Sequence, residues 1–126
     1  MKKIGFIGAG NMAGALAKGL LATKRYRARD HWASDADVGQ LRRFARAHAV
    51  ERAPDNRALV ADSEMIVLAV KPQVMAAVLD EIRPQVTRRR LFVSIAAGIP
   101  TARLESGLGG RVRERVKDLA APAHLR

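Results

Sequence analysis

Residues 4–13, Ile4-Gly-Phe-Ile-Gly-Ala-Gly-Asn-Met-Ala13, decide the fold of this chain. The apolar residues at its start predict a buried strand, and a glycine-rich turn then leads into a helix. The spacing is Gly8-x-Gly10-x-x-Ala13, the dinucleotide-binding fingerprint with alanine in its third position. Gly8 permits the tight turn, Gly10 lets a pyrophosphate approach the backbone, and Ala13 lets the helix pack closely on the strand. The free amides and positive dipole end of that helix suit a diphosphate.

The rest of the chain alternates between strand and helix patterns. After the first strand, further strands are expected at residues 31–34, near Val50, at 65–70 and at 91–95. Helices are expected at residues 11–23, 35–49, from 55 or 56 to 60, from Pro72 onward, and at 101–108. The unbroken apolar run at 65–70 is typical of a central parallel strand covered on both faces. This alternation predicts a single-domain α/β protein with a Rossmann-type doubly wound parallel sheet.

Composition narrows the functional classes. The 126 residues suffice for one modest domain, and no apolar run approaches the ~20 residues of a membrane span. The N-terminus lacks a signal-peptide pattern, so a cytoplasmic protein without a membrane partner is expected. The absence of cysteine excludes a disulfide framework and a thiolate nucleophile, and the three histidines lie too far apart to predict a metal site.

The net charge of +11 raises the question of nucleic-acid binding. The positive residues are mostly arginines scattered along the chain, and the aromatic content of 4% is too low for a base-stacking platform. We therefore expect no nucleic-acid partner, and we expect the charge mainly to attract a phosphate-bearing cofactor.

Several single residues carry local expectations. Asn11 is expected to cap the first helix. His31 and His48 are expected at the surface, because neither has an evident partner in the sequence. Met12 and Met65 are expected in the core. The Ser94 hydroxyl is expected at the core edge, bonded to the backbone.

Three segments together resemble the N-terminal domain of pyrroline-5-carboxylate reductase. They are residues 4–13, the central Leu68-Ala-Val-Lys-Pro72 and the later Val93-Ser-Ile-Ala-Ala-Gly-Ile99. The resemblance implies an NAD(P)-binding Rossmann domain over residues 1–108. It also implies an oxidoreductase of proline biosynthesis that passes hydride from NADPH or NADH to the C=N bond of 1-pyrroline-5-carboxylate.

The resemblance implies a set of cofactor-binding residues, carried over by position. The diphosphate would be lined by Gly8, Ala9, Gly10, Asn11 and Met12. The adenosine ribose or its 2′-phosphate would face Ser34, and the adenosine side would be held by Asn56. The nicotinamide half would run along Ala69, Val70, Lys71 and Pro72. The reactive ring would lie beside Ala96, Ala97 and Gly98. All follow strand carboxyl ends, where open parallel sheets bind ligands. No residue is assigned to catalysis.

Cofactor preference is left open by the end of the second strand. An acidic residue there usually accepts the ribose hydroxyls of NAD, whereas a hydroxyl or an arginine suits NADP. Ser34 is followed by Asp35, so both interpretations stand. Ser34 and the basic surroundings favour NADPH.

The resemblance ends near residue 108. The family continues into another strand and a helical C-terminal domain that supplies dimer contacts and most of the substrate pocket. Residues 109–126 instead predict a basic tail without a strand pattern. We therefore expect a sheet that lacks its last strand, and a truncated cofactor-binding half without the family's homo-oligomer interface or robust reductase activity.

Two alternatives stand beside the reductase. One is a stand-alone NAD(P)-binding module. The other is a different Rossmann reductase of the F420-dependent or β-hydroxyacid type. The segments at 68–72 and 93–99 argue against the second alternative.

Overall fold

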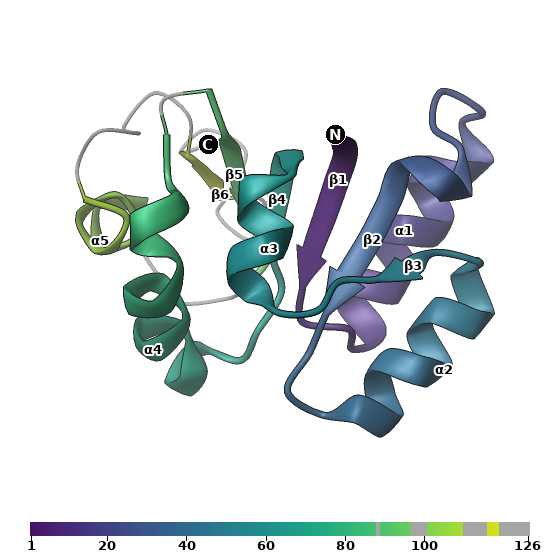
Figure 1. The fold of residues 1–126 in the computed structure, drawn as a ribbon, viewed down its shortest axis with the longest axis horizontal. Coiled ribbons are helices and arrows are strands. Elements are labelled where there is room, and N and C mark those ends of the chain that lie inside the picture. Colours follow the sequence, from purple (N-terminus) through teal and green to yellow (C-terminus); the bar gives the residue numbers. More distant parts are fainter. Residues whose placement is uncertain (88, 97–100, 110–115, 119–126) are drawn as a thin grey trace.

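The computed structural model describes residues 1–87, 89–96, 101–109 and 116–118. Within them, six parallel strands form one sheet in the order β3-β2-β1-β4-β5-β6 (Figure 1). The strands are β1 (Lys2–Ile7), β2 (His31–Ser34), β3 (Glu51–Arg52), β4 (Ser63–Leu68), β5 (Leu91–Ser94) and β6 (Val116–Asp118). The helices are α1 (Asn11–Ala22), α2 (Val38–His48), α3 (Asn56–Ala61), α4 (Pro72–Ile82) and α5 (Thr101–Gly107), with short 3-10 turns η1 (Ala28–Asp30) and η2 (Arg83–Gln85). The predicted Rossmann-type doubly wound sheet is confirmed.

Two apolar clusters cover the two faces of the sheet. In β1, Phe6 packs in the cluster of α1 and α2, whereas its neighbour Ile7 packs in the cluster of α3, α4 and α5. In β4, Val67 and Ile66 divide between the same two faces. Successive side chains of a strand point to opposite faces, so a strand buried on both sides must be apolar at every position. This explains the continuous apolar run that marked β4 in the sequence.

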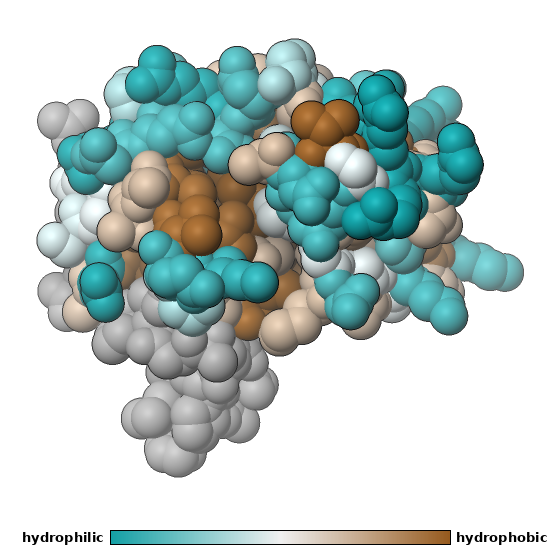
Figure 2. Space-filling view, turned by 90° about the horizontal axis from the view of Figure 1, so that it is seen from below, coloured by the Kyte–Doolittle hydropathy of each residue, from teal (hydrophilic) through white to brown (hydrophobic). Residues whose placement is uncertain are grey.

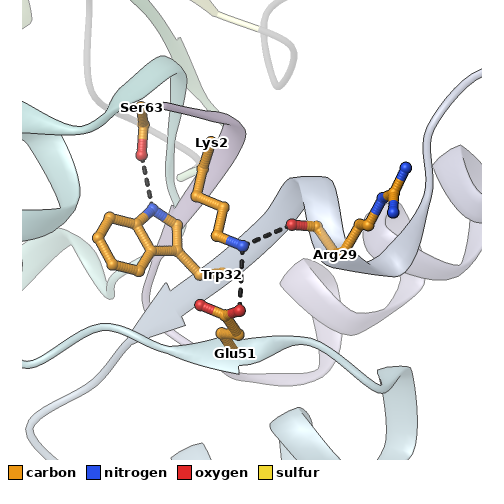
Figure 3. Close-up of polar contacts among 5 residues, drawn as sticks. All are labelled: Lys2, Arg29, Trp32, Glu51 and Ser63. Atoms are coloured by element: carbon orange, nitrogen blue, oxygen red, sulfur yellow. Dashed lines mark hydrogen bonds and ion pairs between the residues drawn. The ribbon is translucent and has the colours of Figure 1, made fainter.

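Polar contacts bridge across strands at the amino-terminal edge of the sheet (Figure 3). Lys2 of β1 donates through Nζ to the carbonyl oxygen of Arg29 at 2.6 Å and pairs with Glu51 of β3 at 3.2 Å. Trp32 of β2 donates through Nε1 to the hydroxyl of Ser63 in β4 at 2.7 Å. The Lys2–Glu51 pair spans β2, and the Trp32–Ser63 bond spans β1. These contacts connect the strands at their amino-terminal ends, away from their carboxyl ends.

Strand β6 corrects the expectation that the sheet lacks its last strand. Residues Val116–Asp118 pair in parallel with β5, with Phe92 opposite Val116 and Ser94 opposite Asp118. Without this strand, β5 would present a row of unpaired backbone groups at the sheet edge. Backbone pairing satisfies those groups whatever the side chains are, so a strand forms where the sequence carries little strand pattern.

Two residue-level predictions at the start of α1 are wrong. Gly10, not Asn11, is the N-cap of α1, and no side chain caps the helix. Met12 is 63% exposed instead of packing in the core, because α1 turns Ala13 and Ala17 toward the sheet. Met65, by contrast, packs against the core as predicted.

His31 is fully buried, so its predicted surface position is wrong. As the first residue of β2 it points to the face covered by α1 and α2, where its ring meets Phe6 edge-on at a centroid distance of 5.9 Å. The Tyr26 ring lies 5.7 Å away on another side. Neither ring nitrogen of His31 has a hydrogen-bond partner among the described residues. Burial lowers the pKa of His31, and the nearby Asp30 carboxylate opposes this only in part.

In the described part of the chain, every helix is too short or too polar to cross a bilayer.

His31 makes the stability of the fold depend on pH. Its pKa in the folded protein lies below the ordinary 6.5, so in acid the unfolded chain binds a proton that the folded chain resists. With respect to His31, the free energy of unfolding is expected to be highest above pH 6.5. It should fall as the pH drops through 6.5 toward the folded-state pKa. Urea unfolding between about pH 5 and pH 8 measures this.

The His31→Phe variant keeps an aromatic ring at this position and removes the titration, so it should flatten the acid slope. Arg46→Gln, at an exposed position on α2, is the control and should keep the slope. An unchanged acid slope in His31→Phe would contradict the assignment.

Candidate functional site

The turn between β1 and α1 fits between the ends of two neighbouring strands. The Gly8 amide donates to the carbonyl of Ser34 at the end of β2, at 2.9 Å. On the other side, the Ala69 amide donates to the carbonyl of Ile7 at 2.8 Å. Gly8 has a φ of +99°, and a Cβ at this position would lie 2.7 Å from the carbonyl carbon and oxygen of Ala69. Glycine is therefore required here both by conformation and by space.

A hollow of about 400 Å³ opens at this turn, and we call it the strand-end hollow. Its lining comes from the glycine turn, the start of α2, the start of α3, the β4–α4 connection and α4: Ile7, Gly8, Ala9, Gly10, Asp35, Ala36, Asp37, Gln40, Asn56, Ala69, Val70, Lys71, Val74 and Val78. Figure 2 views this side of the molecule and shows apolar surface gathered among hydrophilic residues. The hollow thus offers an apolar wall and a polar rim beyond the carboxyl ends of the strands, where open α/β sheets bind ligands.

Asp35 connects the glycine turn to the start of α2. Its Oδ2 accepts a hydrogen bond from the Ala9 amide at 2.8 Å and from the Gln40 side chain at 2.7 Å. Its Oδ1 accepts from the Asp37 amide at 2.8 Å. Both carboxylate oxygens are therefore bonded within the chain, and they hold the turn and the helix start in one arrangement.

Ser34 and Asn56 form one polar chain with Glu81 of α4. The buried Ser34 hydroxyl donates to Oδ1 of Asn56, and the Asn56 amide donates to a carboxylate oxygen of Glu81 at 2.7 Å. Asn56 lines the strand-end hollow, whereas Ser34 lies behind it, 3% exposed. The structure thus brings the two predicted residues together and orients Asn56 through Ser34.

Seven of the predicted cofactor-binding residues meet at the strand-end hollow: Gly8, Ala9, Gly10, Asn56, Ala69, Val70 and Lys71. Asn11 and Met12 follow on the first turn of α1, and Lys71 is the N-cap of α4 with Pro72 as the first helical residue. Ala96 is buried at the end of β5, where its amide donates to the Ser94 hydroxyl at 3.2 Å, as expected for that serine. The predicted residues Ala97 and Gly98 lie outside the described residues.

Seven lining residues were not among the predicted site residues: Ile7, Asp35, Ala36, Asp37, Gln40, Val74 and Val78. Asp37 caps α2 by accepting the Gln40 amide hydrogen bond at 3.1 Å. An aspartate placed three residues before a glutamine is a recognisable helix-start pattern, so this pair could have been found in the sequence. The two valines follow α4 along the hollow, and nothing in their own pattern separates them from core residues.

Two further hollows lie outside the strand ends. One of about 570 Å³ separates α4 from α5, and one of about 450 Å³ separates α1 from α2. The strand-end hollow is smaller, but among the described residues it joins the glycine turn to the β4–α4 connection. Ligands in this fold class bind at that junction. The strand-end hollow is therefore the candidate site, although the other two hollows are larger.

Comparison with known proteins identifies the family. Residues 3–98, most of the chain, match the family described as NADP oxidoreductase coenzyme F420-dependent. The chain belongs to this family. It is 45% identical over 107 residues to pyrroline-5-carboxylate reductase of Pseudomonas aeruginosa, covering 85% of this chain and 39% of that protein. It is 35% identical over 122 residues to the Methanosarcina acetivorans reductase, covering 95% of this chain and 45% of that protein.

Solved structures agree with this assignment. The pyrroline-5-carboxylate reductase from Coxiella burnetii superimposes with a TM-score of 0.77 at 32% identity, covering 86% of this chain and 40% of that chain. The Plasmodium falciparum pyrroline carboxylate reductase with NADP bound gives a TM-score of 0.74 at 27% identity, covering 86% and 38%. The predicted resemblance is confirmed, and the chain spans about two fifths of the length of these relatives.

The two glycines of the turn are expected to respond differently to alanine. Gly8→Ala should lower the free energy of unfolding by about 2 kcal/mol, because the new Cβ meets the Ala69 carbonyl in a strained conformation. Gly10→Ala is the matched control, since a Cβ there meets nothing within 4 Å. Urea unfolding of both variants measures the difference, and equal stabilities would contradict the constraint on Gly8.

Proposed function

We propose that this chain binds a nicotinamide dinucleotide in the strand-end hollow, as the cofactor-binding part of a pyrroline-5-carboxylate reductase. The observation that carries the proposal is the glycine turn, which presents open backbone at the mouth of a hollow beyond the strand ends. Family membership and the relatives named pyrroline-5-carboxylate reductase support it. The reaction would transfer hydride from the cofactor to the carbon of the C=N bond of 1-pyrroline-5-carboxylate, whose nitrogen takes a proton from solvent, and yield proline.

The diphosphate would lie against the first turn of α1. Gly10 carries no side chain, and the space that a Cβ would take is open within 4 Å. No side chain caps α1, so its first amides are available to an anion at the positive end of the helix dipole. We propose Gly10, Asn11 and Met12 as the residues whose backbone would hold the diphosphate. Gly8 and Ala9, whose amides are bonded within the chain, would line the same space.

The adenosine half would lie toward β2, and the nicotinamide half toward β4 and β5. We propose Asn56, oriented by Ser34, for the adenosine side. Ala69, Val70, Lys71 and Pro72 would follow the nicotinamide half, where the nearby Val74 helps to exclude water. Ala96 would lie at the ring end together with Ala97 and Gly98. The bound cofactor supplies the hydride, and no side chain is assigned to proton transfer.

NADPH is the proposed cofactor, with NADH as the second possibility. Asp35 already accepts three hydrogen bonds from the chain and keeps one acceptor position on Oδ1, so it has fewer positions left for the two ribose hydroxyls of NAD. The family description names NADP, and the related Plasmodium structure contains it.

The proposal separates cofactor binding from the complete reaction. We assign cofactor binding to the domain at residues 1–108. Because the chain spans about two fifths of its relatives, we assign binding and reduction of the imine to a reductase of their full length. We further propose that this reductase is a homo-oligomer, as the family resemblance implies. We place the reaction in the cytoplasm, where nicotinamide cofactors and small metabolites meet.

Calorimetric titration of the chain with NADPH and NADH tests the cofactor site. We expect Gly10→Ala to weaken binding by about tenfold, or ~1.4 kcal/mol, because its methyl group enters the space of the diphosphate. Gly19→Ala is the matched control, since Gly19 lies on the same helix, away from the turn, and a Cβ there also meets nothing within 4 Å. Absence of binding by both cofactors, or equal affinities of the two variants, would overturn the proposal.

A further inference from the structure

The hollow between α1 and α2, which we call the α1–α2 groove, adjoins the strand-end hollow. The two share Ala9, Gly10 and Gln40, and the groove continues from there between the two helices with a volume of about 450 Å³. Its lining includes Lys18 of α1 and Arg43 of α2. The groove is therefore a separate space that opens beside the glycine turn.

Positive charge dominates the α1–α2 groove. Lys18, Arg43 and the titratable His48 line it, and no carboxylate does so among the described residues. The ion pairs of the described residues are Lys2–Glu51 and Arg83–Asp80, so neither Lys18 nor Arg43 is neutralised there. Charges of one sign along a concave surface focus the field and attract counter-ions.

Arg43 points back along α2 toward the glycine turn. Its Nη1 lies 3.4 Å from the position that a Cβ on Gly39 would take, in the first turn of the helix. Asp37 Oδ1 lies at the same distance from that point, but it accepts the Gln40 amide hydrogen bond and forms no ion pair with Arg43 in the described structure. The guanidinium therefore lies beside the first turn of α2, and Asp37 and Gln40 at this end of the helix line the strand-end hollow.

His48 reaches across to α1 at the other end of the groove. Its Nε2 lies 3.1 Å from the position that a Cβ on Gly14 would take, so the small residue on α1 makes room for the imidazole. The ring packs on Phe44 at a centroid distance of 4.7 Å, which fixes its orientation. Lys18 follows Gly14 by one helical turn on the same side of α1.

We propose that the α1–α2 groove is a phosphate subsite, with Arg43 as its main ligand, Lys18 as a supporting charge and the His48 imidazole as a further hydrogen-bonding group. The planar guanidinium matches two phosphate oxygens, and lysine adds a point charge. The proposal goes beyond dinucleotide binding. The phosphate would come either from a free phosphate ion or ester, or from the 2′-phosphate of NADPH reaching past Gln40. The second source rests on the proposed function, and the first does not.

The test is a calorimetric titration of the chain with inorganic phosphate, NADPH and NADH. Arg43→Gln and Lys18→Gln are compared with Arg42→Gln and Arg46→Gln, which remove the same charge from exposed positions of α2 outside the groove. We expect Arg43→Gln to weaken phosphate binding by about fivefold, as for a partly exposed charge pair, Lys18→Gln to weaken it less, and both controls to leave it unchanged.

The two sources give different results. If the 2′-phosphate occupies the groove, inorganic phosphate competes with NADPH but not with NADH. Arg43→Gln then weakens the binding of NADPH and leaves the binding of NADH unchanged. If the ligand is a free phosphate, it binds equally well to the chain saturated with NADPH. Either result supports the subsite.

The subsite and the cofactor site can fail separately. Equal phosphate and NADPH affinities for Arg43→Gln and Arg42→Gln would overturn the subsite, even where both dinucleotides bind. Arg43-dependent phosphate binding without binding of either dinucleotide would support the subsite and overturn the proposed function.

Discussion

The close approach of the β1–α1 turn to the end of β4 is the constraint on which the site depends. Gly8 bonds through its amide to Ser34, while the Ala69 amide bonds back to Ile7, so one turn is held between two strand ends. A side chain at Gly8 would occupy the place of the Ala69 carbonyl. Because the turn lies this close to the strand ends, α1 starts beside them, and its N-cap Gly10 lines the strand-end hollow.

Asp35 follows the end of β2, but its carboxylate is bonded within the chain. Its carboxylate accepts the Ala9 amide and two donors at the start of α2, so it joins the turn to the neighbouring helix. Asp35 and Asp37 line the strand-end hollow together with Lys71, so this hollow carries charges of both signs, whereas Lys18 and Arg43 make the α1–α2 groove positive. The two spaces meet at Gln40.

The two ends of the strands carry different kinds of contact. At the amino-terminal edge, Lys2 and Trp32 form bridges across strands, and His31 is buried among aromatic rings. These contacts connect the strands, and their residues do not line either hollow near the carboxyl ends of the strands. The carboxyl ends of the strands are followed by glycines, other small residues and turns, which a ligand can approach.

The sequence by itself determined the alternation of strands and helices in a parallel sheet, the glycine turn and half of the residues that line the strand-end hollow. These features follow from local patterns, because strand periodicity, glycine spacing and proline at a helix start act within a few residues. Tertiary structure alone decided the rest. His31 is buried because α1 and α2 cover the face of β2 on which it lies. Ser34 lies behind Asn56, to which it is hydrogen-bonded. Strand β6 forms because β5 offers an unpaired edge. Each of these outcomes depends on groups far apart in the chain, and no local pattern contains that information.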